Sequence, residues 1–139
     1  MVKTSSRCGT PRLICVRGAP AAGDTLTAEG FEGQYQELGG YTVGFETYTA
    51  HADLAPLFAG LPDDRCQCPH MGIVVKRMLK YHYADGTEDV IGPGEAYVAR
   101  PGHTPELFPD TEVVELSPSA ELAKTVEMVT ANMNKAQGM

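Results

Sequence analysis

The sequence of 139 residues lacks tryptophan, has few basic residues and contains no long apolar run. Its 11 lysine and arginine residues stand against 18 aspartate and glutamate residues, which gives a formal net charge of −7. Because binding to phosphates needs a basic face, this balance argues against a nucleic acid as the main partner. The content of 42% hydrophobic and 21% charged residues also excludes full disorder.

The absence of long apolar runs bears on membranes. No segment approaches the roughly 20 apolar residues of a transmembrane helix. Residues 13–16 form the longest apolar run near the N-terminus, and this run is shorter than the apolar core of about 7–15 residues in a signal peptide. We therefore expect a cytoplasmic protein with no membrane partner. In that compartment the four cysteines are expected to be thiols or metal ligands rather than disulfides.

Short strand patterns, separated by glycine and proline, fill the chain from residue 41 onward. Tyr41, Val43 and Phe45 alternate with less apolar residues, a pattern that predicts a half-buried strand. Further strands are predicted at residues 73–83, 90–91, 96–99 and 112–116, and Asp85-Gly86 predicts a hairpin turn. Residues 53–61 are rich in leucine and alanine and are expected to form one or two helical turns.

A helical period replaces the strand pattern near the C-terminus. Four apolar residues recur at helical spacing and share one helix face: Leu122, Val126, Val129 and Met133. Ser117 before Pro118 predicts an N-cap followed by proline in the first turn. Many short strands followed by one helix predict a small antiparallel barrel or sandwich that the helix closes.

The length fits one domain, but the charge is uneven along it. Four basic residues precede the first acidic residue, Asp24, namely Lys3, Arg7, Arg12 and Arg17. We expect residues 1–24 to form a basic, partly mobile arm with residues 13–16 as a candidate edge strand. The barrel is expected over residues 25–118, and the C-terminal helix and tail over residues 119–139.

The most informative cluster is Cys66, Cys68 and His70. On an extended chain these three side chains point to the same face. Three soft or borderline ligands so close together indicate a metal site, with core packing and a reactive thiol as the alternatives. A disulfide between the two cysteines would close a small, strained ring. His103 follows a predicted strand and turn, and it joins the cluster only if the fold brings that turn against residues 66–70.

Residues 66–116 resemble a small single-domain cupin. The resemblance rests on the order of features: a strand bearing cysteine and histidine, the turn at Asp85-Gly86, the segment that starts at Gly94, and then Pro101-Gly102-His103. It implies an all-β fold, an antiparallel double-stranded β-helix (the jelly-roll or cupin barrel) with a C-terminal α-helix. Cupins usually carry three histidines and one glutamate as ligands, and this sequence departs from that set. His70 stands at the glutamate position, Cys66 at the second histidine and Pro105 at the last histidine.

The strand pattern also predicts a change of register. Before Arg77 the candidate ligands have even numbers, whereas after it the apolar residues have odd numbers. A bulge near Arg77 would reconcile the two series. His82 is then expected on the surface, as is His51 beside the short helical segment.

The predicted metal ligands are Cys66, Cys68, His70 and His103. Two thiolates and two imidazoles suit zinc in a closed tetrahedral site, whereas iron or copper would suit a site in which one ligand is lost or displaced. Zinc is the favoured divalent ion. Glu106 lies three residues after His103 and is a candidate for proton transfer or for orienting a ligand, the alternative being an ordinary loop carboxylate.

Two hypotheses about function follow. The first is a metal-dependent enzyme that acts on a small organic molecule inside the barrel. The second is a non-catalytic cupin that binds a small molecule, or senses metal or redox state, and has a structural zinc site. The resemblance also implies a homodimer, formed by strand exchange or by packing of sheet faces, and the apolar segment 13–16 is a candidate for that contact.

Overall fold

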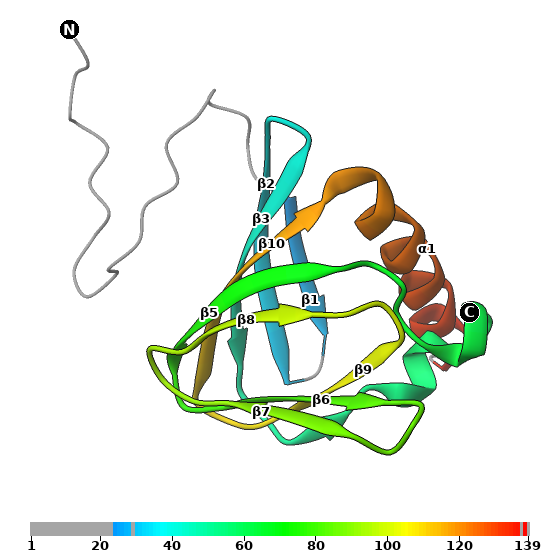
Figure 1. The fold of residues 1–139 in the computed structure, drawn as a ribbon. Helices are drawn as coiled ribbons and strands as arrows, with labels where there is room; N and C mark the ends of the chain where they lie inside the picture. The colour runs from blue at the N-terminus through cyan, green and yellow to red at the C-terminus, as the bar shows by residue number, and fades with distance from the viewer. Residues whose placement is uncertain (1–23, 29, 137, 139) are drawn as a thin grey trace, which may run out of the picture.

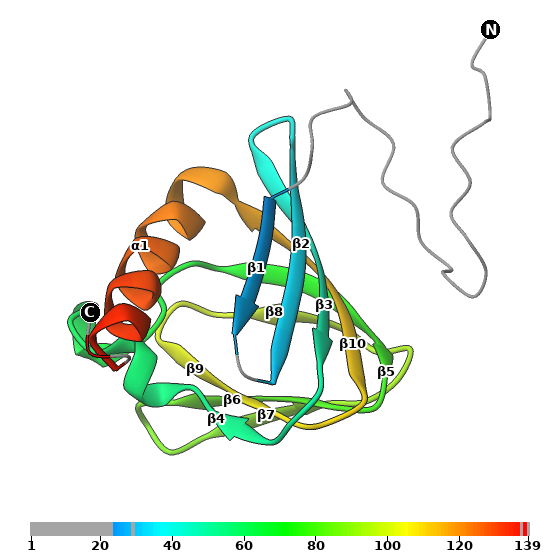
Figure 2. The same cartoon turned by 180° about the vertical axis from the view of Figure 1, so that it is seen from behind.

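The structure is a computed structural model that describes residues 24–28, 30–136 and 138. Its strands form two antiparallel sheets that enclose the core, and the helix α1 (Ser119–Ala136) packs across one end of the barrel (Figure 1; Figure 2). This arrangement confirms the predicted all-β jelly-roll with a C-terminal helix. The predicted arm lies outside the described residues except for Asp24, and so does the candidate edge strand at residues 13–16.

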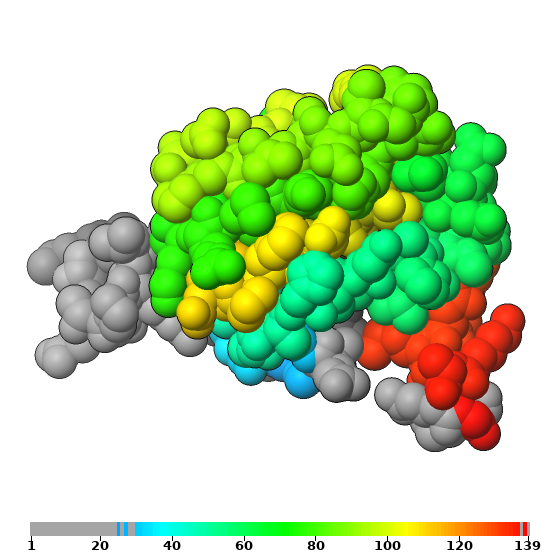
Figure 3. Space-filling view, turned by 90° about the horizontal axis from the view of Figure 1, so that it is seen from below, coloured from blue at the N-terminus to red at the C-terminus, as the bar shows by residue number. Residues whose placement is uncertain are grey.

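Two sheets of unequal size build the barrel. The larger has the order β1 (Asp24–Ala28), β2 (Phe31–Leu38), β3 (Tyr41–Tyr48), β10 (Thr111–Pro118), β5 (His70–Lys76) and β8 (Ala96–Ala99). The smaller has the order β4 (Ala52–Asp53), β9 (His103–Leu107), β6 (Leu79–Tyr83) and β7 (Glu88–Ile91). Two short 3-10 helices, η1 (Ala55–Phe58) and η2 (Pro62–Asp64), connect β4 to β5. Figure 3 shows the smaller sheet from outside, with β4 beside β9.

The predicted change of register occurs at Arg77. This residue has a φ of 71° and separates β5 from β6. The pairing of β5 with β10 shifts at the same level, between Glu112 and Val113. As a result His70 and Val74 are buried before the break, and Tyr81 is buried after it. The turn at Asp85-Gly86 also forms as predicted and joins β6 to β7.

The two faces of β3 differ from the expectation for a half-buried strand. Its more polar, even-numbered side chains face the interior, where Glu46 and Tyr48 line a pocket. Its odd-numbered apolar side chains lie on the other face, where Tyr41 is 44% exposed but Val43 is only 9% exposed. The alternation was correctly identified, but the side facing the interior is the polar one.

The helix α1 begins later than its sequence signal indicates. Ser117 and Pro118 are the last residues of β10, where they pair with Thr42 and Tyr41 of β3. The predicted N-cap at Ser117 is therefore wrong, because pairing of β10 with β3 continues to that point. The helix begins at Ser119, whose backbone N–H donates to the carbonyl of Gly40.

The apolar face of α1 packs against the barrel as the sequence predicts. Its four apolar residues line the pocket: Leu122, Val126, Val129 and Met133. The Asn132 side-chain amide donates to the carbonyls of Leu57 and Ala59, which fixes the helix against η1. Within the described residues, no helix combines the length and apolar character needed to cross a membrane.

Candidate metal centre

Backbone pairing brings the segments of Cys66 and His103 together. The Cys66 N–H donates to the carbonyl of His103 at 2.9 Å, and the His103 N–H donates back to the carbonyl of Cys66 at 3.3 Å. His70 is the first residue of β5 and pairs with Ala99, close to the turn that precedes His103. The fold thus brings residues 66, 70 and 103 to one end of the barrel.

The side chains of Cys66, His70 and His103 converge. Cys66 Sγ lies 3.6 Å from His70 Nε2, and one ligand atom from each of the three residues lies within 4.8 Å of the other two. The rings of the two histidines have their centroids 4.9 Å apart. All three residues are buried, so this is an interior cluster of donors rather than a surface grouping.

Both imidazoles are held through Nδ1. His103 Nδ1 lies 2.6 Å from the carbonyl oxygen of Arg100, and since a carbonyl only accepts, Nδ1 is the protonated nitrogen. His70 Nδ1 lies 2.7 Å from Ser117 Oγ and 3.3 Å from Glu115 Oε1. Partners of this kind fix the ring orientation of metal-binding histidines and leave Nε2 as the coordinating atom.

Burial also sets the protonation states of the cluster. It lowers the pKa of His70 to about 4, and burial together with the neighbouring His70 lowers the pKa of His103 to about 4. Both imidazoles are therefore neutral at pH 7, which is the form that coordinates a metal. Burial raises the pKa of the Cys66 thiol, so the metal-free site holds a thiol rather than a thiolate.

Cys68 is buried next to the cluster but does not belong to it. Its Sγ lies 3.5 Å from the carbonyl oxygen of Pro69, and the side chain packs with Cys66 and Phe58. Residues 67–69 belong to no strand, so the alternation that predicted one shared face is interrupted there. Burial raises the pKa of Cys68 to about 12. The structure therefore brings together three of the four predicted ligands.

Glu106 lies on the outer face of the smaller sheet, opposite Lys80 of β6. Its two carboxylate oxygens lie 2.7 Å from His51 Nε2 and 2.8 Å from His82 Nε2. Hydrogen bonds from His51 and His82 lower its pKa. A spacing of three along a strand puts Glu106 and His103 on opposite faces, so the structure does not bring Glu106 to the metal ligands. The two surface histidines lie on the outside, as expected.

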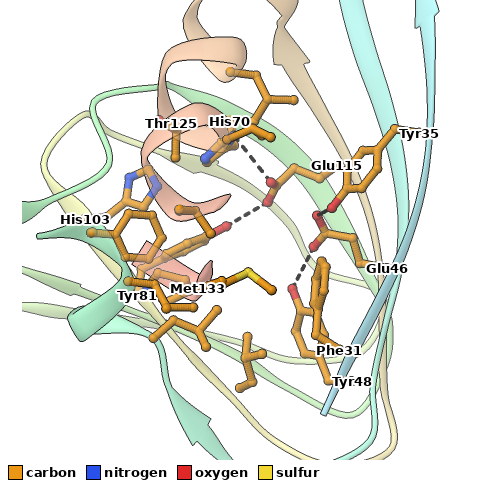
Figure 4. A pocket seen from close by; sticks show the side chains of 18 of the residues that line it. Phe31, Tyr35, Glu46, Tyr48, His70, Tyr81, His103, Glu115, Thr125 and Met133 are labelled. Atoms are coloured by element: carbon orange, nitrogen blue, oxygen red, sulfur yellow. Dashed lines mark hydrogen bonds and ion pairs between the residues drawn. The ribbon is translucent and has the colours of Figure 1, made fainter. Parts of the chain in front are cut away.

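Two carboxyl groups in the pocket were not identified from the sequence: Glu115 is buried and Glu46 is partly buried. Glu46 on β3 and Glu115 on β10 both face the interior of the barrel. Glu46 accepts hydrogen bonds from Tyr35 at 2.9 Å and Tyr48 at 2.8 Å. Glu115 Oε2 accepts hydrogen bonds from Tyr81 and Tyr97. Figure 4 shows the two carboxyl groups on one wall of the pocket, with Glu115 between Glu46 and His70.

Glycines were the sequence signal that could have indicated this wall. A Cβ on Gly33 or Gly44 would lie 2.5 Å or 2.7 Å from atoms of Tyr35. A Cβ on Gly72 would lie 2.6 Å from the Tyr97 hydroxyl. Glycine inside a strand marks a close approach, and here it makes room for the tyrosines that bind the carboxyl groups.

Two members of the cluster, His70 and His103, line a pocket of about 460 Å³. Its volume falls in the range of small-molecule sites, roughly 300–1,000 Å³. His70, His103 and Thr125 lie at one side (Figure 4), and Thr125 Oγ1 is 3.4 Å from Cys66 Sγ. Most of the remaining lining is apolar: Phe31, Leu54, Leu57, Phe58, Leu107, Leu122, Val126, Val129 and Met133. The arrangement can enclose a small molecule with a polar end and an apolar body.

The two carboxyl groups are electrostatically unusual. Burial, and secondly the charge of Glu115, raise the pKa of Glu46 to about 8, although its tyrosine hydrogen bonds act in the opposite direction. Burial likewise raises the pKa of Glu115. No lysine or arginine is found among the described residues that line the pocket. The described lining therefore holds two carboxyl groups without a lysine or arginine partner.

Comparisons with known proteins identify the fold. No protein-family model matches the chain, and no curated protein sequence does either. Among solved structures, ectoine synthase from P. lautus is similar at a TM-score of 0.52 and 10% identity, over 76% of this chain and 78% of that chain. KdgF from Halomonas sp. is similar at a TM-score of 0.48 and 20% identity, over 68% of this chain and 86% of that chain. At these identities the likeness concerns the fold, and the described part of the chain is a cupin barrel.

Proposed function

We propose that this protein is a metal-binding cupin whose Cys66–His70–His103 centre acts on a small organic molecule held in the adjoining pocket. The observation that carries the proposal is the convergence of three buried residues whose donor atoms lie within 4.8 Å of one another, two of which, His70 and His103, line the pocket. Sites with three protein ligands keep a coordination position for water or substrate, whereas structural sites with four ligands are closed.

The donor set fits a divalent metal. Two neutral imidazoles and one thiol suit zinc, with iron and copper as alternatives. When bound, such an ion supplies Lewis-acid chemistry and lowers the pKa of a coordinated water. Cys66, His70 and His103 would hold the ion, and Ser117 and Glu115 would orient the ring of His70 through Nδ1.

The alternative function is a non-catalytic cupin with a structural zinc, in which Cys68 supplies a fourth ligand. This requires its Sγ to turn away from Pro69 toward Cys66. In the structure Cys68 Sγ is not among the converging atoms, which favours the three-ligand centre.

Elemental analysis of the purified protein and of matched variants tests the ligand set. We expect one equivalent of metal in the wild type and in Cys68→Ser, and a loss of metal in Cys66→Ser and His103→Ala. Loss of metal in Cys68→Ser to the same extent as in Cys66→Ser would favour the structural zinc site. A metal-free wild type that takes up no zinc, iron or copper would refute both.

A second experiment tests whether the centre has an open coordination position. Cobalt(II) is exchanged into the protein and its visible spectrum is recorded while azide is added. An open position predicts a saturable spectral change, because azide enters the coordination sphere. A spectrum that azide does not alter would indicate a closed site and contradict a catalytic role.

We also propose that the protein is a homodimer formed through the outer face of its larger sheet. Large apolar side chains are exposed on this face: Tyr41 44%, Met71 48%, Ile73 39%, Val98 62% and Leu116 36%. An apolar patch of this extent is typical of an interface. In a two-fold dimer the same patch meets itself, and a patch without charged side chains at its centre avoids repulsion between like charges. The cytoplasmic location stays a prediction from the sequence.

A further inference from the structure

Glu46 forms part of the pocket wall and lies apart from the proposed metal ligands. Glu46 lies on β3 and does not contact the cluster, and its carboxyl group points into the pocket (Figure 4). Tyr35 donates to Oε1 at 2.9 Å and Tyr48 donates to Oε2 at 2.8 Å. A carboxylate has about four acceptor positions, so each oxygen keeps capacity for a further donor. The tyrosines thus fix the carboxyl group without using it fully.

The described pocket lining has no lysine or arginine to balance a negative charge on this wall. Among the described residues that line the pocket, the side chains that can carry a negative carboxylate charge are Glu46 and Glu115. The Glu46 carboxylate then has no counter-ion, because the described lining contains no lysine or arginine. A buried charge without a partner is costly, so the empty pocket favours the protonated carboxyl group. A cationic ligand would reverse that preference.

We infer that the pocket selects a small organic cation, whose primary ammonium group binds the Glu46 carboxylate and whose apolar body packs against α1 and η1. This inference deepens the proposed function, since it names the chemical class of the molecule that the metal-containing pocket holds. The distribution of lining residues supports it: the carboxyl groups lie on the wall of β3 and β10, and apolar side chains of the helices cover the opposite side. An ammonium group has three donors and matches the free acceptor positions of the carboxylate.

An acidic ligand fits this pocket poorly. A carboxylate group would face Glu46 and Glu115 in a site with a low dielectric, where like charges repel strongly. A neutral ligand of the same shape would bury its apolar body equally well, but it would form only neutral hydrogen bonds with the protonated Glu46 carboxyl group. Charge is therefore the property expected to separate ligands of equal size.

Three probes of matched shape test this inference: benzylammonium, benzyl alcohol and benzoate. Their binding to the zinc-loaded protein is measured by isothermal titration calorimetry, and the zinc content of each sample is measured as well. Charge-assisted hydrogen bonds are about twice as strong as neutral ones. We therefore expect benzylammonium to bind at least about tenfold more tightly than benzyl alcohol. Benzoate is expected to bind more weakly than either.

Variants test whether Glu46 is responsible for the preference for benzylammonium. Glu46→Gln is expected to weaken benzylammonium binding about tenfold and to change benzyl alcohol binding less than about twofold. The control is Glu32→Gln, which removes an exposed carboxylate on β2 and should leave both affinities unchanged. Retained binding of benzyl alcohol shows that Glu46→Gln is folded. The relative affinities of the three probes for the wild-type protein test the inference without any variant.

The outcomes separate this inference from the proposed function. Equal binding of benzylammonium and benzyl alcohol to a protein with one equivalent of zinc would overturn the inference and leave the metal centre intact. Preference for benzoate would overturn it as well, because the pocket would then recognise anions. Preference for benzylammonium in a protein that binds no zinc would support the inference and refute the metal centre.

Discussion

Replacing Ser117 with alanine tests whether hydrogen bonds to Nδ1 of His70 prepare this residue for metal binding. The Ser117 hydroxyl lies 2.7 Å from Nδ1, and Glu115 Oε1 lies 3.3 Å from the same atom. Removing the partner of a metal-binding histidine typically lowers metal affinity about 10- to 100-fold. Since Glu115 remains as an acceptor in Ser117→Ala, we expect a loss of about tenfold, at the lower end of that range. The double variant Ser117→Ala/Glu115→Gln should reach about 100-fold.

The assay is competition for zinc between the protein and a chromophoric chelator at neutral pH. Ser119→Ala is the matched control, because the Ser119 hydroxyl bonds to Thr42 Oγ1 at 2.9 Å and contacts neither histidine. We expect its zinc affinity to equal that of the wild type. Thermal unfolding of each metal-free variant shows whether a loss of affinity reflects a loss of structure.

One result would refute the reasoning. If the double variant is folded and binds zinc as tightly as the wild type, the orientation of the His70 ring does not contribute to metal binding. A loss of affinity in Ser119→Ala as large as in Ser117→Ala would show that the junction of β10 and α1, rather than the hydrogen bond to His70, controls the site.

Three further predictions concern stability and assembly. Burial raises the pKa of Glu46 to about 8, so its contribution to the free energy of unfolding is present at low pH and is lost as the pH rises toward 8. The variant Glu46→Gln should remove this pH dependence. Urea unfolding between pH 5 and about 8 measures it. Leu79 is fully buried, so Leu79→Ala should lower the free energy of unfolding by about 2–5 kcal/mol, whereas Val90→Ala, at a site 55% exposed, should change it by less than about 0.5 kcal/mol. Equal effects of these two variants would contradict the described core. Light scattering should show a dimer that Val98→Lys dissociates and Val90→Lys does not, and a monomeric wild type would exclude the proposed interface.

Local patterns were sufficient to predict the architecture. The alternation after residue 41, the turn at Asp85-Gly86 and the helical spacing from Leu122 to Met133 each depend on neighbours in the sequence, and each appears in the structure. The break between β5 and β6 at Arg77 was predictable for the same reason, because the parity of the candidate inward residues changes on either side of it.

The composition of the site depends on contacts between distant strands, and there the sequence was less informative. Cys68 and Glu106 were chosen because they lie near other ligands in the chain, but an interrupted strand and an odd spacing turn them away from the converging atoms. Glu46 and Glu115 come from β3 and β10, and only the pairing of these two strands places both on one wall. Only Tyr48 shares a strand with its carboxyl partner, since Tyr35, Tyr81 and Tyr97 come from β2, β6 and β8, so no single segment shows the whole group.

The reversed faces of β3 connect these observations. A strand with apolar odd and polar even positions is expected to turn its apolar side inward, because burial of apolar surface is favourable. Here the polar side faces the pocket and the apolar side faces the other way, where Tyr41 is 44% exposed and Val43 is 9% exposed. Such an arrangement is favourable when each face has a matching partner: a polar ligand group for Glu46 inside the barrel and a second apolar sheet outside it. The strand that contradicts the simple rule therefore supports both the recognition of a cation and the dimer.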